Sequence, residues 1–162
     1  MKKLVIVALL ALSGIYGIGY VSLGETGAVR LLNDMLALTA DGNGHGLCEL
    51  YADDLQVNLN DHTAPKGGKF NGGKDEFCEY SKMTSAGVGV LKPTFHVERK
   101  DIAIKRDWLH PWTAEVSYTE SMTMTIPRAN VTIKTESDDK LVLVRTFSGV
   151  KIRRLESEIW AQ

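Results

Sequence analysis

The stretch TAEVSYTESMTMTI, from Thr113 to Ile126, alternates between apolar and polar side chains along its whole length. Its even-numbered positions are apolar except for Glu120, and its odd-numbered positions carry threonine, serine and Glu115. Successive side chains of a strand point to opposite faces, so this period of two predicts a strand with one buried face. Glu120 is the only charged residue on that face, and it is therefore the residue of the segment that points most directly to a functional or structural site.

Strand patterns continue on both sides of this segment. Pro127 to Asn130 has the composition of a turn, and Ser137-Asp138-Asp139 is typical of a break between two strands. We therefore predict further strands over Thr94–Arg106, Val131–Thr135, Leu141–Phe147 and Val150–Trp160.

The first half of the chain has the pattern of helices. Apolar residues recur near helical spacing from Ala28 to Thr39, and shorter helices are predicted over His45–Ala52 and Lys74–Thr84. Leu55–Leu59 alternates like a strand, and the polar, glycine-rich stretch from Asp61 to Gly73 indicates a loop or an irregular hairpin. Three helices and one strand followed by antiparallel strands predict an α+β fold, in which the helices cover one face of a curved sheet.

The N-terminus has the pattern of a membrane anchor. Lys2 and Lys3 precede Leu4 to Leu23, which contains no charged residue and is long enough as a helix to cross the ~30 Å bilayer core. Ala11-Leu12-Ser13 loosely fits a signal-peptide cleavage site, but the apolar run continues beyond it. We expect residues 1–23 to be a retained signal anchor in a bacterial inner membrane, with residues 24–162 in the periplasm. The alternative is a periplasmic protein secreted after cleavage.

The composition excludes several classes of protein. Of the 162 residues, 44% are hydrophobic and 24% are charged, which is typical of a folded domain and not of a disordered chain. The net charge of −1 provides no basic surplus for general nucleic-acid binding. The four histidines do not cluster with the two cysteines, Cys48 and Cys78, so the sequence predicts no metal site and no cofactor.

The order of elements and three short pieces resemble the nuclear transport factor 2-like (NTF2-like) superfamily, which includes ketosteroid isomerase and SnoaL-like proteins. The pieces are Leu50-Tyr51-Ala52-Asp53-Asp54, Gly73-Lys74-Asp75-Glu76 and the closing strands through Trp160. The resemblance covers roughly residues 28 to 160. It implies a cone-shaped, curved antiparallel sheet packed against three N-terminal helices, with a pocket between them. Asp53 and Asp54 have the character of turn or capping residues.

The two cysteines are expected to form a disulfide. Exported domains favour disulfides, while the alternative is two separate buried thiols. The packing implied by the family resemblance brings the second and third helices together, so we predict a Cys48–Cys78 bond between them.

The catalytic residues of ketosteroid isomerases are not matched. When the family's residues are carried over on the Tyr51-Ala52-Asp53-Asp54 piece, the general base falls on Leu59 and the oxyanion-hole tyrosine falls on Met35. Neither side chain can transfer a proton or donate a hydrogen bond to an oxyanion. This argues against isomerase activity.

Glu120 belongs to a candidate ligand pocket with Tyr118, Met122 and Arg145. A carboxylate on an apolar strand face needs a cation or a proton, because an unpaired buried charge is costly. We expect a structural ion pair, with Arg145 on the strand Leu141–Phe147 as the first candidate partner. The alternative is a pocket acid of raised pKa that takes part in catalysis.

Two further groups of residues are candidates. His96 could face the pocket and act with Glu120 in acid/base chemistry, or it could be a solvated histidine. Trp108, His110 and Trp112 crowd one predicted turn, where aromatic side chains suit contact with a partner.

These observations favour a membrane-tethered, exported domain that acts as a non-enzymatic protein-interaction or small-ligand-binding module. Its partner would be an unknown protein, a second copy of the chain or a small apolar ligand. The alternative is a small exported acid/base enzyme, of the isomerase or hydrolase type, that acts on an apolar substrate through Glu120 and His96.

Overall fold

The structure is a computed structural model, and it describes residues 17, 22–63, 68–107 and 109–162. Most of the predicted membrane anchor, residues 1–16 and 18–21, lies outside the described residues. Within the described part of the chain, no helix is both long and apolar enough to span a membrane.

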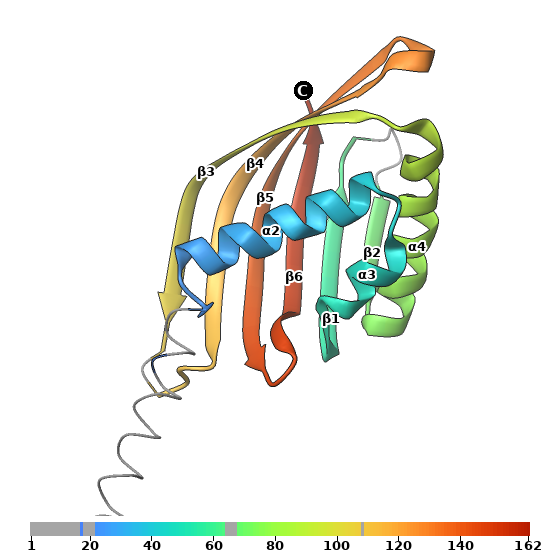
Figure 1. The fold of residues 1–162 in the computed structure, drawn as a ribbon. Helices are drawn as coiled ribbons and strands as arrows, with labels where there is room; N and C mark the ends of the chain where they lie inside the picture. Colours follow the sequence, from blue (N-terminus) through green and yellow to red (C-terminus); the bar gives the residue numbers. More distant parts are fainter. Residues whose placement is uncertain (1–16, 18–21, 64–67, 108) are drawn as a thin grey trace, which may run out of the picture.

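The described chain has an α+β fold, as the sequence predicts (Figure 1). The strands at Thr94–Arg106 and Thr113–Ile126 have the predicted bounds, and the three predicted helices are present. In chain order the elements are α2 (Glu25–Ala40), α3 (Gly44–Glu49), β1 (Tyr51–Asp61), β2 (Gly68–Gly72), α4 (Lys74–Leu91), β3 (Thr94–Arg106), β4 (Thr113–Ile126), the 3-10 helix η1 (Pro127–Ala129), β5 (Val131–Thr146) and β6 (Gly149–Ala161).

The six strands form one curved sheet in the order β2-β1-β6-β5-β4-β3. Four neighbouring pairs are antiparallel, but β1 and β6 are parallel, so the prediction of a wholly antiparallel sheet is wrong at this pair. Their parallel pairing follows from the chain path, since β6 returns from the far end of the sheet and lies beside the N-terminal strand.

All three helices lie on the same side of the curved sheet (Figure 1). The even-numbered residues of β4 that precede Glu120 point toward these helices and are buried, as the period-two pattern predicts. This face and the helices share one core, which removes a large apolar area from water. Its most buried side chains are Leu23, Val57, Val116, Leu141, Leu143 and Ile152.

Several predicted boundaries are wrong. The third helix runs to Leu91 rather than Thr84, and two further errors concern acidic pairs. Ser137-Asp138-Asp139 does not break the chain into two strands, because β5 runs without interruption from Val131 to Thr146. The second helix ends at Glu49 rather than Ala52, so that Asp53 and Asp54 lie within β1 and are not turn or capping residues. Each of these aspartates has an ion-pair or hydrogen-bond partner, which allows it to lie within a strand.

The disulfide between Cys48 and Cys78 is present and joins α3 to α4, with the two Cα atoms 5.3 Å apart. Next to it, the ring of Tyr51 on β1 packs against Phe77 on α4 with ring centroids 5.2 Å apart. Phe70 on β2 also packs against Phe77, with ring centroids 5.4 Å apart. The crosslink and this aromatic cluster together fix α4 to the β1–β2 edge of the sheet.

Candidate functional site

Glu120 forms an ion pair with Arg99, its partner in the register of β3 and β4. The Nε of Arg99 lies 2.7 Å from Oε2 of Glu120, and the two side chains are only 12% and 19% exposed. Arg99 also donates from Nη1 to Oδ1 of Asn33 on α2, at 2.8 Å. The predicted ion pair therefore exists, but its cation is Arg99 and not Arg145.

A second carboxyl group, Asp139, lies on the same face of the sheet and is buried. It is opposite Tyr118 on β4 and Ser157 on β6. The hydroxyl of Ser137 donates to Oδ2 of Asp139 at 2.8 Å. Burial raises the pKa of Asp139, while hydrogen bonds from Ser157 and Ser137 partly oppose this, so the carboxyl keeps its proton to a higher pH than an ordinary aspartate does.

Tyr118 completes this polar group, which we call the Tyr118–Asp139 cluster and define as Tyr118, Glu120, Ser137, Asp139 and Ser157. Burial is the main cause that raises the pKa of Tyr118, and the charges of Asp139 and Glu120 add to it. The Tyr118 hydroxyl therefore stays protonated. It makes no hydrogen bond with any residue that the structure describes.

The other candidate pocket residues do not join this cluster. Met122 lies on the same face, half-buried, with Val97 and Thr135 as its register partners. Arg145 is near the far end of β5, where its backbone N–H donates to the carbonyl oxygen of Trp112 at 2.7 Å.

His96 and Glu120 lie on opposite faces of the sheet. The register places His96 opposite Thr123, on the polar face of β4, and the imidazole is mostly exposed. Its Nε2 lies 3.4 Å from a carboxylate oxygen of Glu98 on the same strand. The structure therefore does not bring together the two proposed acid/base residues.

The residues proposed for partner contact lie near the turn between β3 and β4. Trp112 is partly exposed, and Nδ1 of His110 lies 2.8 Å from Oδ2 of Asp107. Hydrogen bonds from His110 and from the Leu109 N–H lower the pKa of Asp107. Trp108 lies outside the described residues.

The two positions matched to isomerase residues point into the fold. Leu59 is opposite Ser157 in the β1–β6 register, so one row of the sheet runs from Tyr118 through Asp139 and Ser157 to Leu59. Met35 packs partly buried against the core. Tyr118, Asp139 and Ser157 of the cluster lie in this row, on different strands from those that the family resemblance implies. Asp139 lies two residues before Leu141, so the two side chains share the buried face of the strand. This period-two pattern in the sequence could have identified Asp139 as a candidate site residue.

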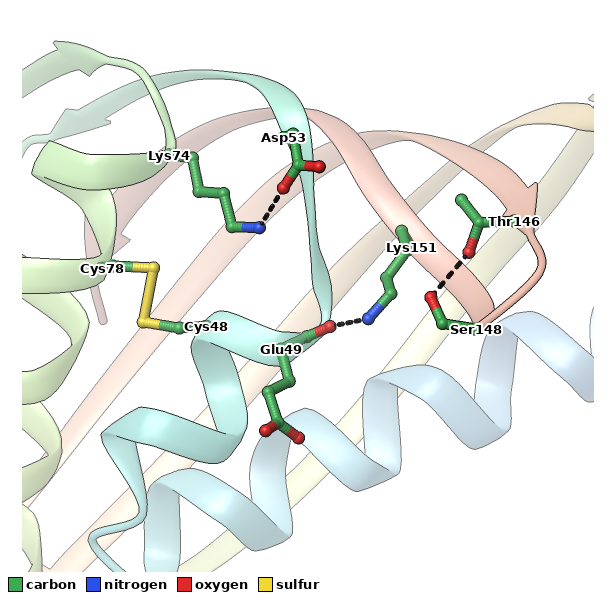
Figure 2. Close-up of polar contacts among 8 residues, drawn as sticks. All are labelled: Cys48, Glu49, Asp53, Lys74, Cys78, Thr146, Ser148 and Lys151. Carbon is green, nitrogen blue, oxygen red and sulfur yellow. Dashed lines mark hydrogen bonds and ion pairs between the residues drawn. A yellow bond between two sulfur atoms is a disulfide. The ribbon is translucent and has the colours of Figure 1, made fainter.

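A separate hollow of about 700 Å³ lies near the start of β1. Figure 2 shows several of the polar residues that line it, among them Asp53, Lys74 and Lys151. The register of β1 against β6 shifts between Tyr51 and Gln56, so β1 bulges there. Lys74 on α4 lies 2.6 Å from a carboxylate oxygen of Asp53, and Arg153 lies 2.7 Å from Asp54.

The charged groups of this hollow have protein partners. The hydrogen bond from Lys74 lowers the pKa of Asp53, and the one from Arg153 lowers the pKa of Asp54. The ammonium group of Lys151 donates to the backbone carbonyl of Glu49 (Figure 2). Among the described residues, no group of three or more histidine, cysteine, aspartate or glutamate side chains is placed to hold a metal ion.

No protein-family model matches the sequence, and no curated protein matches it. Solved structures do match the fold. A candidate scytalone dehydratase from Novosphingobium aromaticivorans is 14% identical, with a TM-score of 0.58 over 100% of this chain and 89% of its own. A candidate dehydratase of the NTF2-like family from Streptomyces avermitilis is 15% identical, with a TM-score of 0.59 over 81% of this chain and 92% of its own.

A ketosteroid isomerase-like protein from Erwinia carotovora atroseptica is 16% identical, with a TM-score of 0.50 over 80% of this chain and 91% of its own. At these identities the likeness concerns the fold, and a fold of this kind supports many functions. The chain has the fold of the NTF2-like superfamily, as the sequence resemblance indicates.

Proposed function

We propose that this chain is an exported, membrane-tethered domain that binds a small apolar ligand through the Tyr118–Asp139 cluster and does not catalyse a reaction. The observation that carries the proposal is the state of the two polar groups on the buried face. Glu120 is neutralised by Arg99, whereas the Tyr118 hydroxyl has no hydrogen-bond partner in the described part of the chain.

The chemistry of the cluster defines the ligand class. The Tyr118 hydroxyl, whose pKa is raised, presents a hydrogen-bond donor. Val116 and Met122 lie on the same face of β4 as this donor. Such a surface suits a ligand with an apolar body and one carbonyl or hydroxyl oxygen.

Export and tethering rest on two further features. The Cys48–Cys78 disulfide is typical of an oxidising compartment such as the periplasm. The apolar sequence from Leu4 to Leu23, preceded by Lys2 and Lys3, has the length and charge placement of an inner-membrane anchor.

Binding of 2-naphthol, followed by its fluorescence, tests the ligand class because this probe has an apolar body and one hydroxyl group. We expect Tyr118→Phe to weaken binding by about tenfold, the value of roughly one buried hydrogen bond. Tyr51→Phe is the matched control, since the Tyr51 hydroxyl already pairs with Ser81 at 3.4 Å, away from the cluster. Equal affinity of both variants and wild type would contradict a role for Tyr118.

The second candidate is an acid/base enzyme in which Asp139 is the proton-transferring group. The raised pKa of Asp139 supports this alternative, and so do the dehydratase and isomerase names of similar folds. Exchange of the α-protons of 2-tetralone in D₂O, followed by NMR, separates the two candidates. The binding module leaves the exchange rate at the level of buffer, whereas the enzyme accelerates it and loses this effect in Asp139→Asn.

A further inference from the structure

The face of the sheet that points away from the helices has a hollow of about 490 Å³, which we call the outer hollow. It is lined in part by Val142, whose neighbours Leu141 and Leu143 are buried on the helix side of β5. Because successive side chains of a strand point to opposite faces, the outer hollow and the Tyr118–Asp139 cluster lie on opposite sides of the sheet. Its polar and charged lining includes Asp54, Gln56, His110, Arg153 and Arg154.

Two consecutive arginines reach the outer hollow because β6 has a bulge. In a regular strand, Arg153 and Arg154 would point to opposite faces of the sheet. In the ladder with β5, Val142 pairs with Arg154, and the next pair joins Leu143 to Ile152. Arg153 is therefore an extra residue in this register, and both arginines are exposed and line the outer hollow. Bulges change the direction of side chains in this way and are common beside functional sites.

The two arginines differ in their partners. Nη2 of Arg153 lies 2.7 Å from Oδ2 of Asp54, which is the one carboxylate among the described residues that line the outer hollow. Arg154 donates instead to the amide oxygen of Gln56, at 3.3 Å, and forms no ion pair with any described residue. Its register neighbours, Val142 on β5 and Gln56 on β1, are uncharged. The outer hollow therefore contains one guanidinium whose charge no described carboxylate compensates.

Other carboxylates on the outer face have cations of their own in the register. Glu115 on β4 is opposite Lys105 on β3. Glu156, which follows Arg154 by two residues on β6, is opposite Lys140 on β5. Opposite charges across a ladder stabilise each other. These pairs leave Arg154 as the cation of this region that faces neutral side chains.

His110 lines the outer hollow from the turn between β3 and β4. Its Nδ1 lies 2.8 Å from Oδ2 of Asp107. This hydrogen bond is the main cause that lowers the pKa of Asp107, so the carboxylate is ionised at neutral pH and Nδ1 carries the hydrogen. The bond orients the ring and leaves Nε2 as the imidazole nitrogen that a ligand can contact.

We propose that the outer hollow binds a phosphomonoester group through Arg154, with Arg153, Gln56 and His110 as further hydrogen-bonding residues. The bond from Arg154 to Gln56 is long for a charged donor, so the guanidinium can exchange it for a phosphate oxygen and offer its planar fork. The amide NH₂ of Gln56 also remains to donate. Arg153 uses Nε and Nη2 for Asp54 and keeps Nη1.

The number of donors favours phosphate over carboxylate. A phosphomonoester has three terminal acceptor oxygens and a charge of about −1.5 to −2 at pH 7. A carboxylate has two acceptor oxygens, and the fork of one guanidinium satisfies both. The outer hollow instead presents donors from side chains on β1, on β6 and in the β3–β4 turn, which suits a group with more oxygens and more charge.

Titration of the isotope-labelled full chain in detergent micelles with phenyl phosphate tests the site, with the NMR signals of backbone amides around the outer hollow as the readout. We expect saturable shifts at constant ionic strength, and Arg154→Gln should raise Kd at least about tenfold, as for the loss of one charged hydrogen bond. Arg128→Gln is the matched control. It removes the same charge from the exposed η1, at the other end of β4, and should leave Kd unchanged.

Two further titrations define the ligand class. Benzoate has the same ring and a carboxylate, and we expect it to bind at least about fivefold more weakly than phenyl phosphate. Phosphatidic acid in phosphatidylcholine vesicles carries the phosphomonoester group on a lipid. Arg154-dependent binding of phenyl phosphate alone would identify a soluble ligand, and tighter Arg154-dependent binding to these vesicles would identify a lipid headgroup; both results support the proposal.

Three results would overturn the proposal. They are shifts that grow without saturation, equal Kd for Arg154→Gln and wild type, and equal affinity for benzoate and phenyl phosphate. Arg154→Lys keeps the charge but not the planar fork, so its affinity should lie between those of wild type and Arg154→Gln. Arg154 is exposed, so both variants should keep the wild-type fold. Because the Tyr118–Asp139 cluster lies on the other side of the sheet, failure here would leave the proposed ligand site intact.

Discussion

Glu120 on β4 and Arg99 on β3 face each other across the strand ladder and form an ion pair that is largely removed from water. Because Arg99 also donates to Asn33, the pair connects the sheet to α2. Two buried charges stabilise a fold weakly when paired, but the loss of one leaves the other uncompensated. The pair is therefore a sensitive point of the fold, although Glu120 also belongs to the Tyr118–Asp139 cluster.

Glu120→Gln should lower the free energy of unfolding by about 1–3 kcal/mol, because Arg99 keeps its charge and loses its counterion. Urea denaturation of the variant beside wild type measures this change. Glu98→Gln is the matched control, since Glu98 lies on the exposed face of β3 and should change stability by less than about 0.5 kcal/mol. Equal midpoints for Glu120→Gln and wild type would show that the pair is not structural.

Asp139→Asn should change how stability depends on pH. Burial raises the folded-state pKa of Asp139 above its ordinary value of 3.8, so the folded state binds this proton more tightly than the unfolded state. The tighter binding of this proton stabilises the folded state fully below about pH 3.8, and the stabilisation is lost as the pH rises through the folded-state pKa. Asparagine has no proton to lose, and the variant should gain stability relative to wild type as the pH increases.

Urea denaturation of both proteins at pH 4, 5.5 and 7 checks this expectation. Carboxyls whose pKa is lowered, such as Asp53 and Asp54, give the opposite pH dependence, but they are common to both proteins and cancel in the difference. Asp138→Asn, which removes the neighbouring exposed carboxyl, is the control for loss of charge. A difference between wild type and Asp139→Asn that stays constant from pH 4 to 7 would contradict the prediction.

Local patterns predict much of the fold. The alternation from Thr113 to Ile126 gives β4 with correct bounds, because a half-buried strand needs one apolar and one polar face. The pairing of Cys48 with Cys78 is correct since the chain has only these two cysteines and the superfamily's packing places their helices together. The first feature depends on residues close in sequence. The second depends on a pairing for which the chain offers only one combination of cysteines.

What the sequence could not predict depends on register and on distant partners. Ser137-Asp138-Asp139 has the composition of a turn, and only the serines on β5 and β6 make Asp139 acceptable inside a strand. The choice of Arg99 over Arg145 depends on the register of β3 against β4, which shifts at a bulge between Lys100 and Ala103. The parallel pairing of β1 with β6 similarly joins segments about 100 residues apart.

The bulge in β3 gives a prediction of its own, because Asp101 has a positive φ of 54° there. L-residues with a Cβ atom are strained in this region, whereas glycine adopts it freely. Asp101→Gly should be more stable than Asp101→Ala by about 1 kcal/mol, as measured by thermal unfolding. The neighbouring Lys100 lies in regular strand, so its Gly and Ala variants should have the reverse order. The same order at both positions would show that the bulge does not require a positive φ.

Removal of the Cys48–Cys78 disulfide should detach α3 selectively. This helix has only six residues, which is too short to be stable without tertiary contacts. Its other contacts include the buried Leu47, the bond from Lys151 to the Glu49 carbonyl, and an N-cap bond in which the Asn43 side chain accepts from the Gly46 N–H. In Cys48→Ser/Cys78→Ser the free energy of unfolding should fall by about 3 kcal/mol, as expected for a loop of this length.

Native-state hydrogen exchange distinguishes this outcome from general unfolding. We expect the amides of α3 to exchange faster in the double variant under conditions in which β4 and β5 keep their protection, because the crosslink joins α3 to α4 and neither cysteine lies on these strands. Tyr51 and Phe77 remain in contact through the aromatic cluster, so α4 should stay attached to β1. If β4 and α3 lost protection to the same extent, the disulfide would stabilise the domain as one unit, and the selective role in holding α3 would be wrong.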